Sequence, residues 1–245
     1  MRREACLAEY LGRYIELTEL ERTALDGIVT GARHYRRGAV VRAEHGAPGD
    51  VMVVLGGWLS SSALLEDGRR QIIRLHFRGD LLGLDGLAFA EAPDTITSLT
   101  DADVCIVDSI ALGGVFADHP RIGALLFAAQ QIERVTLTER LVSLGRASAK
   151  GRVAALLMWV ANRMRAADMP VDDGFILPLT QEEIGDLTGL TAVHVNRTLR
   201  ALAEQGLIMR TGGTLRIPDV ARLARLANHT PRRETMIVGW LPPAR

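Results

Sequence analysis

The feature that most constrains this chain is a segment around residue 190 in which two short helices flank a tight turn. Thr180 is placed to cap the first helix, and Glu183, three residues later, completes a capping box. Gly185 lets the two helices approach closely, and Gly189 suits a turn that needs a left-handed backbone. Thr191 is placed to cap the second helix. The segment therefore predicts a helical hairpin with fixed ends.

Apolar residues of the two helices point to one shared core. They are Ile184, Leu187, Leu190, Val195, Leu199 and Leu202. The opposite face of the second helix exposes Ala192, Val193, Asn196, Arg197 and Arg200. This is the helix-turn-helix arrangement, in which the second helix enters the major groove of DNA. Taken alone, the same pattern also fits an ordinary helical hairpin.

The residues that follow favour the DNA-binding interpretation. Two short segments, residues 207–210 and 214–217, flank Thr211-Gly212-Gly213 and are predicted to be strands. A Gly-Gly turn between such strands predicts a β-hairpin, here in the position of a wing. Upstream, residues 153–164 predict one more helix, and residues 175–178 predict a short strand.

The length of 245 residues allows two domains, each with its own core. Net charge is zero, but residues 1–145 carry 15 basic and 20 acidic side chains, whereas residues 146–245 carry 14 and 9. A basic half that holds a helix-turn-helix fits a phosphate-facing module. The asymmetry is modest, so an incidental origin stays open.

Cysteine content argues against a disulfide framework or a metal motif. Cys6 and Cys105 lie far apart in the sequence, and no CxxC occurs. Cys105 lies in an apolar run and is expected to be a small core residue. The start of the chain lacks the apolar stretch of a signal peptide, and no run is long enough to cross a bilayer. We therefore expect a cytoplasmic protein in a reducing compartment.

The first half of the chain changes from helical to β patterning. Residues 4–30 have helical apolar spacing, and short apolar runs broken by turn residues then continue to about residue 110. The runs are Val40-Val41, Val51 to Leu55, Trp58 to Leu65, Ile72 to Phe77 and Val104 to Val107. Glu66-Asp67-Gly68-Arg69 is a hairpin turn. Strands at such close spacing predict a β-sandwich or barrel, and with the helices an α+β fold.

A long helix is predicted from Pro120 to Leu144, followed by a break at residues 145–151. Four apolar residues lie three and four positions apart, with the seam spacing of a coiled coil. They are Ile122, Leu125, Ala129 and Ile132. We interpret this as a dimerisation helix; a helix that only covers its own domain remains the alternative.

The order of a β-roll, a long helix and a winged helix-turn-helix resembles the CRP/FNR superfamily of bacterial transcription regulators. Landmarks of this resemblance are residues 34–41, 46–50, 55–59, 66–70, 79–83 and 179–208. It implies a jelly-roll-like sensor domain over 1–118, a dimerisation helix over 119–146 and a DNA-binding domain over 147–228. It further implies a homodimer on an inverted-repeat operator in double-stranded DNA, with RNA polymerase as a partner if the protein is an activator.

The cyclic AMP ligand set of that family is not matched here. Cyclic AMP-binding members have a ribose-binding Glu where this chain has Leu84, and a phosphate-binding Arg where it has Asp94. Asp85 follows Leu84 directly in the sequence. A carboxylate at the phosphate position would repel the ligand. The polar pair that contacts adenine corresponds to Leu137 and Thr138, of which only Thr138 matches. We therefore expect no cyclic AMP binding, and these five residues mark the corresponding effector pocket.

Other members of the family bind an iron–sulfur cluster or haem. Cys6 and Cys105 cannot supply the four thiolates of an iron–sulfur cluster. His34, His45 and His76 leave a haem-binding alternative open, although surface or hydrogen-bonding histidines are the simpler interpretation. No cofactor and no metal are expected, and the effector stays unidentified or absent.

The resemblance also gives roles to the DNA-facing residues. Arg197 corresponds to an Arg that contacts guanine, while Ala192 and Val193 replace an Arg and a Glu. Val193 is suited to a thymine methyl group and Asn196 to adenine. Phosphate contacts are expected from Gln181, Thr191, His194 and Arg200.

Two rival functions fit less well. An enzyme of the cupin type would need clustered metal ligands, and the chain has no His-x-His, nucleophile elbow, P-loop or dinucleotide fingerprint. A protein-binding winged helix would not need Arg197 and Arg200 exposed beside Asn196. The tail over 229–245 lies outside the resemblance, and its apolar segment 236–241 is free to pack on the chain or on a partner.

Overall fold

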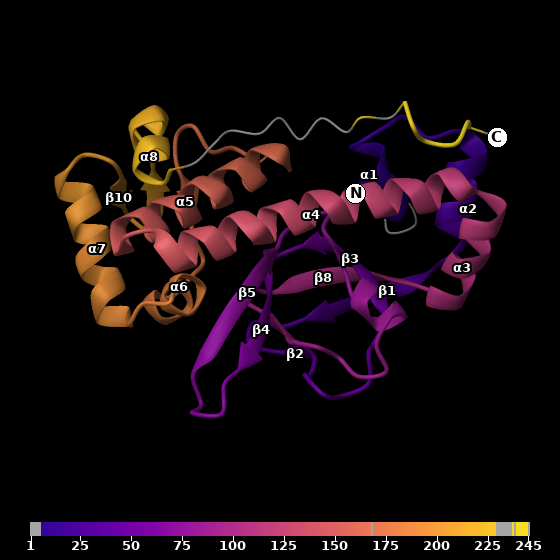
Figure 1. The fold of residues 1–245 in the computed structure, drawn as a ribbon, viewed down its shortest axis with the longest axis horizontal. Coiled ribbons are helices and arrows are strands. Elements are labelled where there is room, and N and C mark those ends of the chain that lie inside the picture. Colours follow the sequence, from indigo (N-terminus) through magenta and orange to yellow (C-terminus); the bar gives the residue numbers. More distant parts are fainter. Residues whose placement is uncertain (1–5, 168, 229–236, 238, 245) are drawn as a thin grey trace. The chain divides into compact units, whose positions relative to one another are not determined.

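The computed structural model describes residues 6–167, 169–228, 237 and 239–244. The chain divides into two compact units. Unit 1 comprises Met1–Ala63, Arg74–Val135 and Arg233–Arg245, and unit 2 comprises Leu64–Ile73 and Thr136–Arg232. Helix α4 (Pro120–Arg146) contributes residues to both units (Figure 1).

Two four-stranded sheets form the β-roll. Their strand orders are β1-β8-β3-β6 and β2-β7-β4-β5. The strands are β1 (Val29–Tyr35), β2 (Val40–Arg42), β3 (Val51–Gly56), β4 (Leu59–Leu64), β5 (Arg70–His76), β6 (Leu81–Leu82), β7 (Thr95–Ser98) and β8 (Ala102–Val107), with a 3-10 turn η1 (Leu84–Leu87) after β6. Val54 of β3 and Leu59 of β4 lie in one buried cluster, so both sheets share a core. The predicted strands and the α+β class are confirmed.

Two helices precede the sheets, where the sequence predicts helical spacing through residue 30. They are α1 (Cys6–Gly12) and α2 (Glu19–Gly27). Thr18 caps α2 in a capping box with Glu21. The helical prediction is wrong for Val29, which begins β1 and pairs with Val107 of β8.

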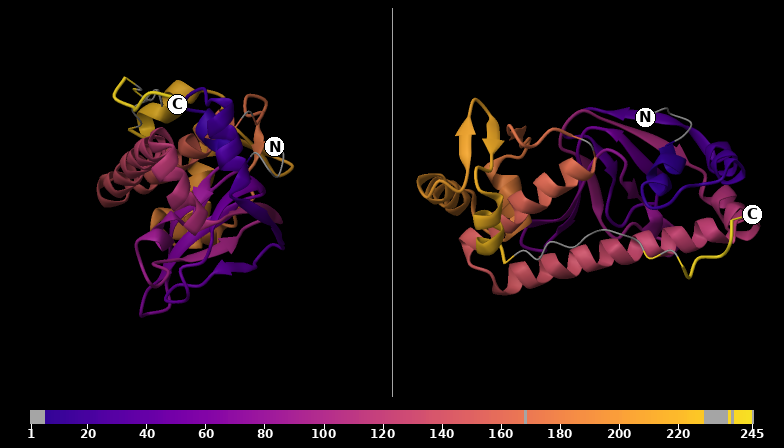
Figure 2. Two further views of the ribbon diagram at one scale, coloured as in Figure 1. Left: turned by 90° about the vertical axis from the view of Figure 1, so that its right-hand side faces the viewer. Right: turned by 90° about the horizontal axis from the view of Figure 1, so that it is seen from above.

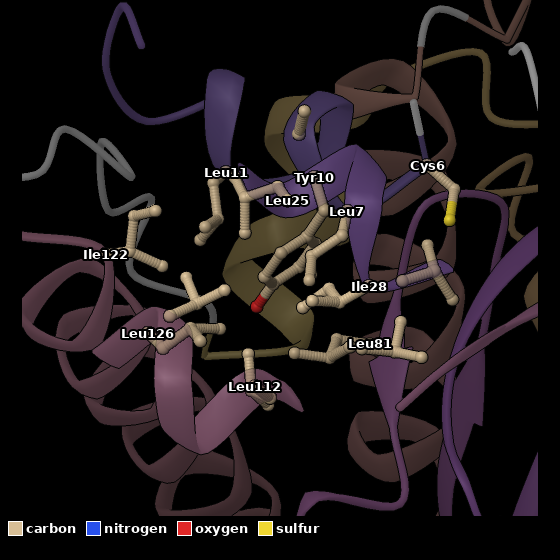
Figure 3. Close-up of a cluster of buried hydrophobic side chains, with 14 of the residues drawn as sticks. Cys6, Leu7, Tyr10, Leu11, Leu25, Ile28, Leu81, Leu112, Ile122 and Leu126 are labelled. Atoms are coloured by element: carbon tan, nitrogen blue, oxygen red, sulfur yellow. The ribbon is translucent and has the colours of Figure 1, made fainter. Parts of the chain in front are cut away.

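A large apolar core joins these helices to one sheet and to the first half of α4. Leu7 and Leu11 of α1 point toward Ile122 and Leu126 of α4, with Leu112 of α3 (Ser109–Asp118) close by (Figure 3). All five side chains are buried. Burial of several large side chains, each worth about 1.5–3 kcal/mol, makes α1 an integral part of unit 1.

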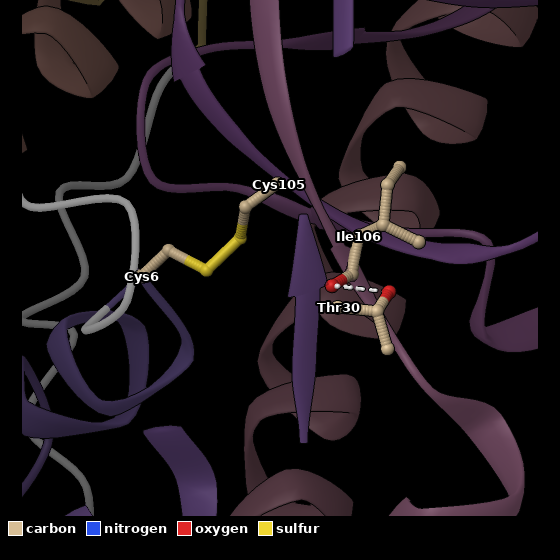
Figure 4. Close-up of a disulfide and its surroundings, with 4 residues drawn as sticks. All are labelled: Cys6, Thr30, Cys105 and Ile106. Carbon is tan, nitrogen blue, oxygen red and sulfur yellow. Dashed lines mark hydrogen bonds between the residues drawn. A yellow bond between two sulfur atoms is a disulfide. The ribbon is translucent and has the colours of Figure 1, made fainter. Parts of the chain in front are cut away.

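The two cysteines form a disulfide, which corrects the expectation of unpaired thiols. Cys6 at the start of α1 is joined to Cys105 in β8, across 99 residues of sequence (Figure 4). Both residues are fully buried, so Cys105 is a core residue as predicted. Sequence separation misled the prediction because β8 runs next to β3, on which α1 packs.

The dimer stripe predicted on α4 needs a correction. Ile122, Leu125 and Ala129 have no exposed surface and belong to the core of unit 1, and only Ile132 is partly exposed. Side chains buried by their own chain offer no contact to a second copy. The large apolar side chains that α4 does expose are Phe127, Leu137, Leu141 and Val142.

Besides the end of α4 and residues 64–73, unit 2 contains four helices and a small sheet among its described residues. The elements are α5 (Ala149–Ala166), β9 (Phe175–Ile176), α6 (Gln181–Thr188), α7 (Ala192–Glu204), β10 (Met209–Thr211), β11 (Thr214–Arg216) and α8 (Val220–Leu226). The sheet order is β10-β11-β9, and β10 and β11 stand out as a hairpin in the right-hand view of Figure 2. The break between α4 and α5 is shorter than predicted, because Ser148 already caps α5.

The described part of the tail packs on unit 1. The Trp240 ring meets Phe127 edge-on at 6.5 Å between ring centroids, and Leu241 contacts the core that holds α1. Met236 and Val238 of the predicted apolar segment lie outside the described residues. No single helix among the described residues is long and apolar enough to span a membrane; only α3 and α4 taken together pass by length and composition, with a 116° bend between them.

Candidate nucleic-acid interface

The first helix of the hairpin begins as predicted. The Thr180 hydroxyl accepts from the backbone N–H of Glu183 at 3.1 Å, and the Glu183 carboxylate accepts from the N–H of Thr180 at 2.6 Å. This capping box satisfies two backbone donors that the helix cannot pair internally. The start of α6 is thereby fixed by its own sequence.

The turn depends on two glycines. Gly189 ends α6 with φ of 64°, a left-handed conformation that glycine adopts without steric cost. A Cβ at Gly185 would collide with the backbone oxygen of Leu190, so only glycine allows this approach of the turn to α6. Both predicted roles are confirmed.

The second helix, α7, presents the predicted face. The Thr191 hydroxyl accepts from the N–H of His194, so this residue caps α7. Val195, Leu199 and Leu202 are buried, as the shared core requires. Thr191, Val193, Arg197 and Arg200 are exposed, and Gln181, Ala192, His194 and Asn196 are partly exposed.

Charge on this face is available for a ligand. Among the described residues, neither Arg197 nor Arg200 forms an ion pair or a side-chain hydrogen bond. Val193 keeps 79% of its surface exposed. On α7 the exposed Val193 lies one turn before Arg197, and an apolar side chain beside unpaired guanidinium groups suits base edges and phosphates of DNA.

The wing is confirmed as well. Met209 pairs with Arg216 and Thr211 with Thr214 in an antiparallel hairpin. Gly212 and Gly213 have φ of 58° and 86°, as a tight hairpin turn demands. Leu215 pairs with Phe175 of β9, which ties the wing to the rest of unit 2.

Several contacts that hold α6 were not predicted. Arg70 donates through Nε to Asp186 Oδ2 at 2.8 Å, and the Gln71 amide donates to the backbone oxygen of Asp186. The carbonyls of Leu187 and Thr188 accept from Arg140 and Arg152. Arg70 and Asp186 are 116 residues apart, so no local pattern in the sequence reveals this pairing.

The turn to which the sequence resemblance assigns the phosphate of cyclic AMP contains an internal ion cluster. Arg42 Nη1 lies 2.5 Å from Asp85 Oδ1, and Nη2 lies 2.8 Å from Asp85 Oδ2. Nη2 also contacts Asp94, and Nη1 donates to the carbonyl of Pro48. The Arg42 side chain is only 3% exposed. The Asp94 carboxylate is thus paired, which the sequence did not predict.

The opposite charges of Arg42 and Asp85 stabilise each other's charged forms. Burial acts to lower the pKa of Arg42, but the hydrogen bonds to Asp85 and Asp94 outweigh it, and the pKa is raised. Burial acts to raise the pKa of Asp85, but the hydrogen bonds and charge of Arg42 outweigh it, and the pKa is lowered. Arg42 and Asp85 are therefore held in their charged forms at neutral pH.

The remaining candidate effector residues do not form one site within a unit. Leu84 is partly buried and packs on the core of unit 1. Leu137 and Thr138 belong to unit 2 and are exposed.

Each candidate haem histidine has a polar neighbour. His34 pairs with Asp103 at 2.9 Å, and His45 lies 3.8 Å from Glu91. The buried His76 hydrogen-bonds to Ser61 through Nε2 at 2.8 Å. These positions match the simpler interpretation of surface or hydrogen-bonding side chains.

Taken together, the capped helix-turn-helix, its unpaired arginines and the wing define a winged-helix DNA-binding regulator that also carries a β-roll. A model of the Crp-like helix-turn-helix domain matches residues 151–226, and a model of the cyclic nucleotide-binding domain matches residues 32–119.

Individual relatives agree with these domain matches. The nitrogen fixation regulation protein FixK of Bradyrhizobium diazoefficiens is 32% identical over 196 residues, which cover 79% of this chain and 81% of the relative. The transcriptional activator protein FnrL of Cereibacter sphaeroides is 31% identical over 195 residues, covering 78% of each. The solved structure of FixK2 from Bradyrhizobium japonicum superposes with a TM-score of 0.74 at 27% identity, over 82% of this chain and 98% of that one. The chain belongs to the CRP/FNR superfamily of transcription regulators, whose members named here are regulators and not enzymes.

Proposed function

We propose that this protein regulates transcription as a homodimer that binds an inverted-repeat operator. The observation that carries the proposal is the face of α7, where Val193, Arg197 and Arg200 are exposed on a helix whose start and turn are fixed. In such a dimer each α7 occupies a major groove, and the two half-sites lie about one helical turn, roughly 34–36 Å, apart.

The exposed part of α4 supports the homodimer. Leu137 and Leu141 lie one helical turn apart, and 38% and 70% of their surfaces are exposed; Val142 is exposed next to them. Leucines one turn apart on an exposed helix face form a seam that a second copy of the same helix can cover. This surface replaces the buried stripe from Ile122 to Ala129.

The β-roll of this protein works without cyclic AMP in our proposal. Arg42 is already engaged by Asp85 and Asp94, so the cluster carries one net negative charge where the ligand's phosphate would need a positive one. The disulfide between Cys6 and Cys105 leaves neither thiol available as an iron ligand. We further propose that the protein acts in the cytoplasm and that it contacts RNA polymerase as a transcriptional activator does.

A selection of genomic DNA by the purified full-length protein tests this function. The protein is incubated with fragmented genomic DNA at near-physiological salt, and the retained fragments are sequenced. Enrichment of an inverted repeat with half-sites one helical turn apart is expected. The Arg197→Ala variant, treated in the same way, serves as the matched control and should lose one conserved base pair in each half-site. Enrichment of single, unpaired half-sites would contradict the homodimer, and retention that ignores sequence would contradict the operator.

A further inference from the structure

Unit 2 contains a cavity of about 550 Å³ that the DNA-binding role does not use. Its walls come from the end of α4, the first half of α5, the end of α6 and the end of α8. Apolar surface is supplied by Leu144, Leu156, Trp159, Leu187 and Leu226. A cavity of this size with mostly apolar walls falls in the range of small-molecule sites.

Two guanidinium groups line the same cavity without a carboxylate partner. Arg140 donates to the carbonyls of Ile72, Ile73 and Leu187, and its Cζ lies 5.8 Å from the centre of the Trp159 ring. Arg152 donates to the carbonyl of Thr188 at 2.9 Å. Within the part of the chain that the structure describes, neither forms an ion pair.

The positive charge of these groups is poorly compensated. Burial lowers the pKa of Arg140 to about 10. The Nε atom of Arg152 is buried and has no hydrogen-bond partner among the described atoms. A buried donor without an acceptor is destabilising, and an anionic ligand could supply the missing acceptor. Arg146 and one carboxylate, Glu139, also line the cavity, so its walls remain positive overall.

The backbone adds to this preference. Helix α5 begins at the cavity, where Ser148 and Gly151 line the wall. The N–H of Gly151 is bonded to the Ser148 hydroxyl, but the positive end of the dipole of this 18-residue helix still favours an anion.

We propose that this cavity binds a small organic anion with an apolar body, such as an aryl-alkyl carboxylate, whose charge is met by Arg140 and Arg152. The site lies wholly within the DNA-binding unit and is separate from the β-roll turn that carries Arg42.

In this proposal, an anion bound in the cavity changes the position of α6 in the helix-turn-helix. Arg140 and Arg152 hold the last carbonyls of α6, at Leu187 and Thr188, immediately before the Gly189 turn. An anion that draws either guanidinium into the cavity weakens those bonds and shifts the end of α6 relative to α7. This consequence rests on the proposed function, whereas binding itself does not.

Calorimetric titration of the full-length protein tests the binding. The probes are phenylacetate, 4-phenylbutyrate and 6-phenylhexanoate, each paired with its uncharged amide. We expect saturable binding of at least one acid and about tenfold weaker binding of its amide, equivalent to about 1.4 kcal/mol. Arg152→Met should abolish the preference for the acid, and Arg222→Met, on exposed α8 surface outside the cavity, should retain it.

A second variant guards against loss of folding. Ala155→Phe fills the cavity from α5 without removing a hydrogen bond, and should abolish binding while the circular dichroism spectrum is kept. Equal affinity for acid and amide, or no binding of any acid, would overturn the proposal. If only a monomeric Leu141→Glu variant bound the acid, the cavity would be filled by the partner copy in the dimer. That result would also overturn the proposal.

The effect on DNA is measured separately. Affinity for a selected operator with and without the binding acid should differ at least threefold. An unchanged affinity with binding intact would overturn the coupling to α6, and a protein that binds the acid but no DNA at all would instead contradict the proposed function.

Discussion

The guanidinium of Arg42, at the end of β2, is clamped by both carboxylate oxygens of Asp85, at 2.5 and 2.8 Å, and Asp85 lies in the turn η1. Such two-pronged pairs are the strong geometry for arginine and carboxylate. Since Asp94 holds the same guanidinium, the turn is stabilised by side chains of the chain itself.

Replacing Arg42 should destabilise unit 1 markedly. Arg42→Met leaves Asp85 and Asp94 close together with no cation between them, at 30% and 15% side-chain exposure. Breaking a buried pair on one side costs about 3–5 kcal/mol, and partial exposure of Asp85 places the expected loss near the lower end. Urea unfolding measures it. In the matched control Arg33→Met, the exposed pair with Asp50 is lost and the change should stay below about 1 kcal/mol.

The same cluster predicts a pH dependence. Because the pKa of Asp85 is lower in the folded protein than its ordinary value of 3.8, the folded state binds this proton less readily than the unfolded state. The stabilisation is present above the unfolded pKa and is lost as the pH falls through the folded one. Unfolding free energy measured from pH 6 to pH 3 should fall less steeply for Asp85→Asn than for the wild type. The exposed Asp118→Asn serves as control, and equal slopes for all three proteins would contradict the prediction.

The sequence reveals the helix-turn-helix so fully because its determinants are local. Thr180 hydrogen-bonds to Glu183, and Gly185 leaves room for the carbonyl of Leu190. Gly212 adopts the positive φ that its own turn needs. Each interaction joins residues only a few positions apart. Backbone chemistry and short spacing are enough to predict such features.

Pairings across the fold were not predictable in this way. Cys6 meets Cys105 and Arg42 meets Asp94 over 99 and 52 residues. Any of several charged residues fits these patterns, and only the strand order decides which of them meet. Likewise, the spacing of Ile122 and Leu125 predicts an apolar face of the helix. The spacing does not show whether that face is covered by the core of the same chain or by a partner chain.

Gly185 should not tolerate any side chain. In Gly185→Ala the new methyl group collides with the carbonyl of Leu190, so the turn must shift away from α6. Overpacking of this kind costs about 1–3 kcal/mol and should also weaken operator binding. Gly145→Ala in α4 is the matched control, since no atom lies within 4 Å of its new methyl group. The control should gain about 0.5–1 kcal/mol of stability from its higher helix propensity. Melting temperatures that change in the same direction for both variants would contradict this interpretation.

Dimerisation through the second half of α4 is testable with one charge. Leu141→Glu places a carboxylate on a side chain that is 70% exposed, so the fold of a single chain should be unaffected. A charge buried in a dimer seam without a partner is costly, and the variant should sediment as a monomer. Ile110→Glu, on α3 and 88% exposed, should sediment as the wild type does. A dimer that persists in Leu141→Glu would exclude this surface.

The exposed arginines of α7 should differ in what they contribute to DNA binding. Arg197→Ala is expected to remove a contact to a guanine, worth about 1–3 kcal/mol, and to relax specificity at one base pair. Arg200→Ala removes a phosphate contact, so affinity should fall for every sequence, and the slope of log K against log salt should decrease by about one. Neither side chain has a partner among the described residues, so both variants should fold normally. Binding isotherms on the selected operator and on single-base variants, at several salt concentrations, separate the two effects. Equal losses for both variants on all sequences would show that Arg197 contacts phosphate rather than a base.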